Sequence, residues 1–193
     1  MPFDPLSPAS DETLLARYAM GDPRASAELA ARLLPRVLNQ ATRMLGDVAE
    51  AEDVSQEAML RLWRVAPDWR RGEAKVSTWL YRVTANLCTD RLRKRRDVLM
   101  DAEFDPVDDA LAAEDTLQDQ DRMNALQIAL DALPDRQRQA VVLRHIEGLA
   151  NPEIAQIMQI SARAVESLTA RGKRALSAAF ENRGDALGFE DDG

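Results

Sequence analysis

The sequence predicts an all-α protein of two small helical domains joined by a flexible acidic linker, with a helix-turn-helix in the second domain. Three observations predict it. Apolar residues recur at the roughly 3.6-residue period of a helix along most of the chain, between stretches that contain Gly, Pro or Asp. This period disappears over residues 97–122, which carry ten Asp and Glu and one Arg. It then resumes as a short helix, a tight turn and a longer helix.

Three helices are expected before residue 66. The first is short and follows Ser10, whose hydroxyl suits an N-cap. The second covers about residues 24–45 and ends at Gly46, and Pro35 inside it should kink or split it. The third covers about residues 49–65.

The third helix has a buried stripe and an outer side that carries polar residues and one leucine. The outer positions used below are Asp53, Gln56, Glu57, Leu60 and Arg64. Leu60 on this side is either a contact for a partner or part of a core stripe wide enough to cover it.

The next predicted helix starts near Thr78 and carries the most basic part of the chain. Residues 61–96 hold eleven Lys and Arg and three Asp and Glu. One face is apolar; on another face a large aromatic, cations and hydrogen-bonding groups recur at steps of three or four. These residues are Lys75, Trp79, Arg82, Asn86, Thr89 and Arg93, followed by Lys94, Arg95 and Arg96. Unstacked bases bind π-surfaces and phosphates bind cations, so this face suits nucleic acid. A solvated basic helix with Trp79 in the core is the alternative.

After the linker, helical patterns cover residues 123–133 and the stretch from Asp135, a predicted cap, to Gly148. Asn151 is then expected to cap a short helix with Pro152 at its first position, and Ser161 to cap a longer one. The predicted boundaries are 1–96 for the first domain, 97–122 for the linker and 123–183 for the second domain. The acidic end, 184–193, is expected to be disordered.

The longer helix of the predicted helix-turn-helix presents cations outward. Arg163 and Ser167, near its start, are candidates for contacts to base edges in a major groove. The candidates for phosphate contacts are Arg171, Lys173 and Arg174. A helix-turn-helix with a purely structural role is the alternative here.

The composition allows a nucleic-acid-binding protein and excludes several other kinds of site. The formal net charge is -8, but two basic segments are separated by the acidic linker, which makes nucleic-acid binding by segments possible. The single cysteine, Cys88, excludes an internal disulfide and suggests a buried thiol, and the single histidine, His145, excludes sites that need two imidazoles. No signal peptide, membrane span, glycine-rich phosphate loop or metal-ligand spacing is recognisable, so a soluble cytoplasmic protein without cofactor, metal or catalytic residues is expected.

The chain resembles the extracytoplasmic-function (ECF) sigma factors, the two-domain class of bacterial transcription initiation factors in the sigma-70 family. The stretch AEDVSQEAMLRLWR (51–64) resembles their helix that binds the RNA polymerase clamp, and residues 70–96 resemble their promoter-melting segment. Residues 133–176 resemble their reader of the -35 promoter element. The resemblance covers roughly residues 11–96 and 123–180.

The resemblance implies a role for each surface. Asp53, Gln56, Glu57, Leu60 and Arg64 would bind core RNA polymerase. The loop 72–77 with Lys75, Trp79, Arg82 and Asn86 would capture a flipped base of the -10 element, with Arg93 and Lys94 on its backbone. Arg163, Ser167, Arg171, Lys173 and Arg174 would contact the -35 element. The linker would run toward the polymerase cleft, and an anti-sigma factor would hold the protein inactive until a stress releases it.

Two departures from the family pattern limit what the resemblance implies. Gln159 stands where the helix-turn-helix often has glycine, so a looser turn is expected. Glu166 and Leu168 replace a lysine and an arginine often found early in the recognition helix, so no -35 sequence is implied. The alternative function is a sigma mimic, which sequesters an anti-sigma factor without binding DNA; such mimics lose the basic and aromatic residues that this chain keeps in 70–96.

Overall fold

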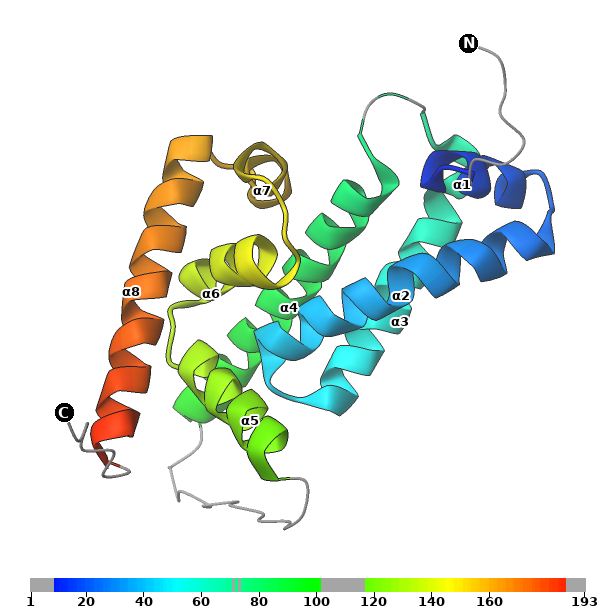
Figure 1. Ribbon diagram of the computed structural model, residues 1–193. Helices are drawn as coiled ribbons and strands as arrows, with labels where there is room; N and C mark the ends of the chain where they lie inside the picture. Colours follow the sequence, from blue (N-terminus) through cyan, green and yellow to red (C-terminus); the bar gives the residue numbers. More distant parts are fainter. Residues whose placement is uncertain (1–8, 71, 73, 102–116, 187–193) are drawn as a thin grey trace.

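The computed structural model describes residues 9–70, 72, 74–101 and 117–186 of the 193-residue chain. Within these ranges every regular element is a helix, which confirms the all-α prediction. Figure 1 shows the helices of residues 9–101 on one side of the molecule and those of 117–186 on the other, packed together along α2 and α4. We call these the N-terminal half and the C-terminal half. None of the helices in the described ranges combines the length and the apolar character that a membrane crossing requires.

The N-terminal half packs four helices and a short turn around one core. The elements are α1 (Asp11–Ala19), α2 (Pro23–Leu45), α3 (Val48–Val65), the 3-10 turn η1 (Ala66–Asp68) and α4 (Val76–Asp101). Their apolar faces enclose a core in which Leu14, Leu29 and Leu62 are fully buried. Ser10 caps α1 as predicted, accepting a hydrogen bond from the Thr13 N–H at 3.2 Å. The helix α4 begins two residues before its predicted start.

Pro35 does not split α2, which runs without interruption from Pro23 to Leu45. The proline lies on the exposed side of the helix, as does Ala31 four residues before it. The Ala31 carbonyl therefore loses its helical donor where water can replace it, which lowers the cost of keeping Pro35 inside the helix.

The C-terminal half contains the predicted helix-turn-helix. Its elements are α5 (Leu117–Asp131), α6 (Asp135–Val141), the π-helical turn η2 (Val142–Ile146), α7 (Asn151–Met158) and α8 (Ala162–Ala186). Ser161 caps α8 as predicted, accepting from the Ala164 N–H at 3.2 Å. The other two predicted caps are wrong by one position: Pro134 precedes α6 and Ala150 precedes α7, so Asp135 and Asn151 are first helical residues.

The turn between α7 and α8 is tight although it lacks glycine. Gln159 adopts the left-handed conformation, with φ 53° and ψ 47°, and its N–H donates to the Ala155 carbonyl. Among the residues that the structure describes, it is the only non-glycine with a positive φ. A left-handed L-residue costs about 1–2 kcal/mol, so the packing of α7 against α8 must offset that cost.

The two halves share an apolar core. Met44, Leu45, Val54 and Cys88 of the N-terminal half pack against Leu130, Leu133, Val141 and Val142 of the C-terminal half. Arg138, only 6% exposed, crosses the same boundary and donates to the Met44 carbonyl at 2.6 Å. Both ends of the predicted linker are helical, because α4 extends to Asp101 and α5 begins at Leu117. Residues 102–116 and 187–193, where the rest of the linker and most of the acidic tail fall, lie outside the described residues.

Gly172 is required where α8 crosses α6. A Cβ atom at this position would lie 2.5 Å from Cγ2 of Val141. In an open helix, Gly→Ala stabilises by roughly 1 kcal/mol. We expect the opposite sign for Gly172→Ala, a loss of about 1–3 kcal/mol in the free energy of unfolding, because the added methyl overpacks the contact. Urea denaturation measures it, with Ser177→Ala on the exposed side of α8 as the control. A raised unfolding midpoint for Gly172→Ala would show that the two helices are not in this contact.

Cys88 is buried in the shared core, as the sequence predicted, with no exposed surface. Burial raises the pKa of its thiol to about 12, so the reactive thiolate is scarce at neutral pH. We expect the native protein to resist alkylation and thiol–disulfide exchange at pH 8, and the urea-unfolded protein to react at the rate of a free cysteine. Labelling by a chromogenic disulfide reagent tests this, and rapid labelling of the native protein would contradict it.

Candidate nucleic-acid interface

The six residues predicted to bind the -10 element all lie on α4 or directly before it. Lys75, Asn86, Arg93 and Lys94 are exposed, and Trp79 and Arg82 are half-buried. The structure therefore brings them onto one helix, with four side chains accessible from outside and two set into the surface.

A cavity of about 360 Å3 opens beside Trp79 and Arg82. The rest of its lining is Val65, Asp68, Trp69, Arg70 and Ala74. The rings of Trp69 and Trp79 meet edge to face, with centroids 5.8 Å apart. The Nε1–H of Trp69 is buried without a hydrogen-bond partner among the described residues. Trp79 thus borders a recess and is not enclosed in the core. Sequence reasoning missed Trp69, although an aromatic residue in the turn before a basic helix was a visible signal.

The cations at the end of α4 differ in what they contact. Arg95 is half-buried, 2.9 Å from a Glu50 carboxylate oxygen, and donates to the Leu45 carbonyl, so it fastens α4 to α2 and α3. Arg93 and Lys94, the two predicted backbone contacts, both remain exposed. Both side chains are accessible to a phosphate, and Arg93 lies 3.1 Å from a carboxylate oxygen of Asp90.

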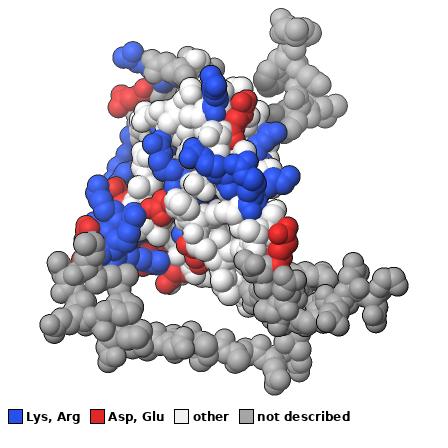
Figure 2. Space-filling model, turned by 90° about the vertical axis from the view of Figure 1, so that its left-hand side faces the viewer, with Lys and Arg blue, Asp and Glu red and all other residues white. Residues whose placement is uncertain are grey.

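The predicted -35 surface lies along α8. Arg163, Ser167 and Arg171 border a shallow groove of about 460 Å3, and Lys173 and Arg174 are exposed farther along the helix. Arg136 of α6 lines the same groove, and sequence reasoning missed it because its place beside α8 depends on helix packing. Figure 2 looks onto the side of the molecule where α8 lies and shows Lys and Arg side chains gathered across its middle. This side is suited to the phosphates of a duplex.

The five residues predicted to bind polymerase share the outer face of α3. Asp53, Gln56, Leu60 and Arg64 are exposed and Glu57 is half-buried. Leu60 is 48% exposed, so the wide-core interpretation of this leucine is wrong. A hydrogen bond from Arg61, 2.8 Å away, lowers the pKa of Glu57 and keeps its carboxylate charged. An exposed leucine framed by charges is typical of a protein-binding surface.

The C-terminal half covers part of the α4 face. Glu153 at the start of α7 lies 2.9 Å from the Lys75 ammonium, and this hydrogen bond raises the pKa of Lys75 and lowers that of Glu153. Glu147 accepts from the Tyr81 hydroxyl at 2.7 Å and from the Asn39 amide at 2.6 Å. Tyr81 itself is only 4% exposed. A second cavity beside Trp79 and Arg82, of about 240 Å3, is lined on its other side by two glutamines. Gln156 is in α7, and Gln159 directly follows it.

In comparison with known protein families, the chain matches Sigma-70 region 2 over residues 29–98 and Sigma-70 region 4 over residues 123–176. The chain is 35% identical over 167 residues to the ECF RNA polymerase sigma factor SigW of Bacillus subtilis, covering 81% of this chain and 89% of that one. The chain belongs to the ECF sigma factors of the sigma-70 family. The predicted family is thereby confirmed, and this sigma factor is a regulator of transcription.

Solved structures share the fold of this sigma factor. CnrH, in complex with the cytosolic domain of CnrY, is 26% identical with a TM-score of 0.69, over 90% of this chain and 99% of that one. The sigma factor RpoE from Bartonella quintana, in complex with the anti-sigma factor NepR, is 19% identical with a TM-score of 0.68, over 80% of this chain and 96% of that one. The region 2 match covers most of α2, all of α3 and α4 up to residue 98, and the region 4 match covers α6, α7 and α8 up to residue 176. The helix α1 lies outside both matches.

Proposed function

We propose that this sigma factor binds core RNA polymerase through the outer face of α3, holds the opened -10 element on α4 and reads the -35 duplex with α8. The proposed division is the predicted one: residues 1–96 for polymerase and the -10 element, 97–122 as linker and 123–183 for the -35 element. It acts in the cytoplasm, in a stress response, without catalytic activity of its own.

The recess beside Trp79 and Arg82 is the observation that carries this proposal. Opening a duplex exposes bases, and each base that stacks on an aromatic side chain recovers about 1–3 kcal/mol. Trp79 supplies such a surface at the edge of a 360 Å3 cavity, and Arg82 supplies a cation beside it. A sigma mimic has no use for a basic, aromatic recess, so this feature favours a DNA-binding sigma factor.

The arrangement of the two halves in this structure is too compact to engage both promoter elements. By their numbering the elements lie about 25 base pairs apart, or roughly 85 Å at about 3.4 Å per base pair. A compact chain of this length has a radius of gyration of about 16 Å. The protein therefore has to separate its halves before α4 and α8 can bind one promoter. We call the packed arrangement the closed form and the separated one the open form.

Separation exposes the shared core and breaks the contacts of Glu147, Glu153 and Arg138, so it is unfavourable for the protein alone. A partner that binds the separated halves has to supply that free energy. We assign this role to core RNA polymerase. A partner that binds the packed halves acts in the opposite direction. We propose an anti-sigma factor for it, as the complexes of CnrH and of RpoE with their partners suggest.

In vitro transcription tests the proposal. Purified protein and core polymerase are incubated with fragments of the source genome, and the transcripts are sequenced to recover the promoter. We expect RNA from a small set of start sites with shared sequences near -10 and -35. No specific RNA from any template, with a well-studied sigma factor active on the same core, would overturn the proposal.

A further inference from the structure

In the part of the chain that the structure describes, the start of α4 has no capping side chain from its own segment. The Lys75 carbonyl accepts the first helical hydrogen bond, from Trp79, at 3.1 Å, so Lys75 occupies the N-cap position. A lysine side chain has no acceptor, so it cannot satisfy the free N–H groups of the first turn. Val76, the first helical residue, is fully buried, so water does not serve its N–H either. This N–H needs an acceptor from elsewhere in the protein.

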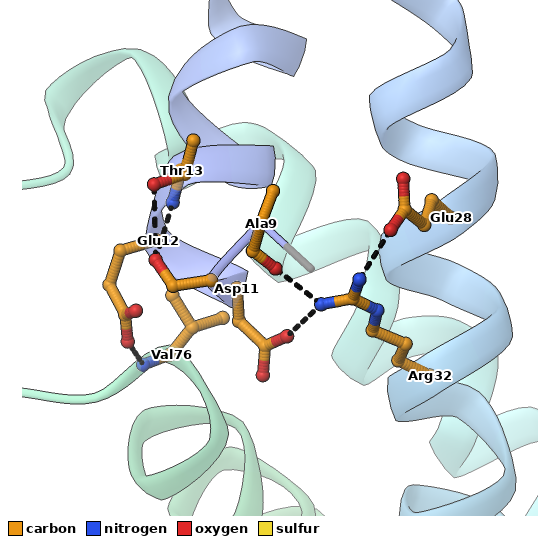
Figure 3. A network of polar contacts seen from close by, with 8 residues as sticks. Ala9, Asp11, Glu12, Thr13, Glu28, Arg32 and Val76 are labelled. Carbon is orange, nitrogen blue, oxygen red and sulfur yellow. Dashed lines mark hydrogen bonds and ion pairs between the residues drawn. The ribbon is translucent and has the colours of Figure 1, made fainter. Parts of the chain in front are cut away.

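Glu12 of α1 provides that acceptor from 64 residues away in the sequence. Its Oε1 lies 3.2 Å from the Val76 nitrogen, and Figure 3 shows the carboxylate reaching from α1 to the start of α4. A negative charge here also interacts favourably with the positive end of the helix dipole. Burial acts to raise the pKa of Glu12, but hydrogen bonds from backbone N–H groups, that of Val76 among them, outweigh it and lower the pKa.

The position of Glu12 is itself fixed by contacts to α2. Arg32 donates to the Ala9 carbonyl at 2.6 Å, pairs with Asp11 at 3.5 Å and also contacts Glu28 (Figure 3). Leu14 and Leu15, one turn farther on, are fully buried in the core of the N-terminal half. These contacts hold the first turn of α1 against α2, and the Glu12 side chain extends from this turn to the start of α4.

We propose that Glu12 is a positioning residue for promoter opening: by capping α4 from α1, it fixes where the helix begins and so where Lys75 and Trp79 stand. The loop before α4 includes Gly72 in a left-handed conformation, and the cap fixes the end at which this loop joins the helix. Glu12 precedes the region 2 match, so that match assigns it no role. The inference rests on the proposed function, because it assumes that the α4 face opens DNA.

The test compares Glu12→Ala, Glu12→Gln and Asp11→Ala in the full-length protein, with core polymerase and the promoter recovered by transcription. Asp11→Ala is the matched control, since it removes an acid of the same turn that does not contact α4. Its 3.5 Å contact with Arg32 is lost, but the 2.6 Å hydrogen bond from Arg32 to the Ala9 carbonyl still holds α1 against α2. Permanganate reactivity of the -10 thymines measures opening. Loss of a helix cap shifts the equilibrium for forming the helix start about fivefold. We therefore expect Glu12→Ala to lower the fraction of open promoter about fivefold. Glu12→Gln, which keeps an acceptor oxygen, and Asp11→Ala should stay within twofold of the wild type.

Two further measurements separate positioning from a general loss of structure. Binding of the free protein to -35 duplex should be the same for Glu12→Ala and wild type, and hydrogen exchange of the Val76 amide should accelerate in Glu12→Ala alone. Equal opening by Glu12→Ala and wild type would overturn the inference, as would a fivefold loss of -35 binding in the same variant. If wild-type holoenzyme opens no promoter, the proposed function fails first, and the Val76 exchange rate still tests the cap.

Discussion

Trp79→Ala is expected to lower the fraction of open promoter complexes about 5- to 150-fold, because a base that stacks on an aromatic ring recovers about 1–3 kcal/mol. Permanganate reactivity of the -10 thymines measures this loss in the reconstituted holoenzyme. Binding to core polymerase should be unchanged, since Trp79 is on α4 and the predicted polymerase contacts are on α3. Trp79→Phe keeps a flat aromatic face and should retain most of the opening.

Trp63→Phe is the matched control for this experiment. Trp63 packs against Tyr18 of α1, with ring centroids 4.7 Å apart, and does not border the cavity. Its replacement should leave opening within twofold of the wild type. If Trp79→Ala opens the -10 element as well as wild type does, the aromatic recess is not where bases stack.

Glu147→Ala is expected to shift the equilibrium from the closed form toward the open form about 5- to 150-fold. Glu147 is the acceptor for the Tyr81 hydroxyl and the Asn39 amide across the boundary between the halves. Without it, a buried hydroxyl loses its partner in the closed form but is hydrated in the open form, a difference of about 1–3 kcal/mol. The apparent affinity for single-stranded DNA is proportional to the fraction of protein in the open form, which is the form that binds it. A labelled single strand of the -10 element should therefore bind the free protein more tightly, by the same factor, until the open form predominates.

Glu181→Ala provides the control for this second experiment, because it removes one acid from the exposed side of α8 and so matches the change in net charge. Its affinity for the single strand should equal that of the wild type. Small-angle X-ray scattering adds an independent measure, since the open form is longer. Equal single-strand affinity and equal radius of gyration for Glu147→Ala and wild type would refute the role of Glu147 in closing the protein.

Local patterns predicted the helices of this sigma factor well, because their causes are local. Ser10 and Ser161 cap the helices that they were expected to cap, and Leu60 could be recognised as out of place on a polar side. The predictions that were wrong concern residues whose conformation depends on the surrounding fold. Whether Pro35 splits its helix depends on which side of α2 faces water. Gln159 was expected to loosen its turn, yet it adopts the conformation that glycine usually takes.

The candidate site was predictable as sets of residues on single helices, and its contacts between distant segments were not. The period placed Trp79 and Arg82 on one face, but nothing in it indicated that Trp69 completes the recess. Likewise, the sequence does not show that Glu12 reaches α4 or that Glu147 reaches Tyr81, because both contacts depend on how whole helices pack. The residue roles taken from the family resemblance remain predictions for the experiments above.

The apolar boundary between the halves also makes temperature a variable of this protein. Separating them hydrates aliphatic side chains such as Leu130 and Val142, which gives the opening reaction a positive heat-capacity change. Aliphatic contacts weaken on cooling, because hydration of such groups becomes less unfavourable in cold water. We therefore expect chilling to shift the equilibrium between the two halves from the closed form toward the open form.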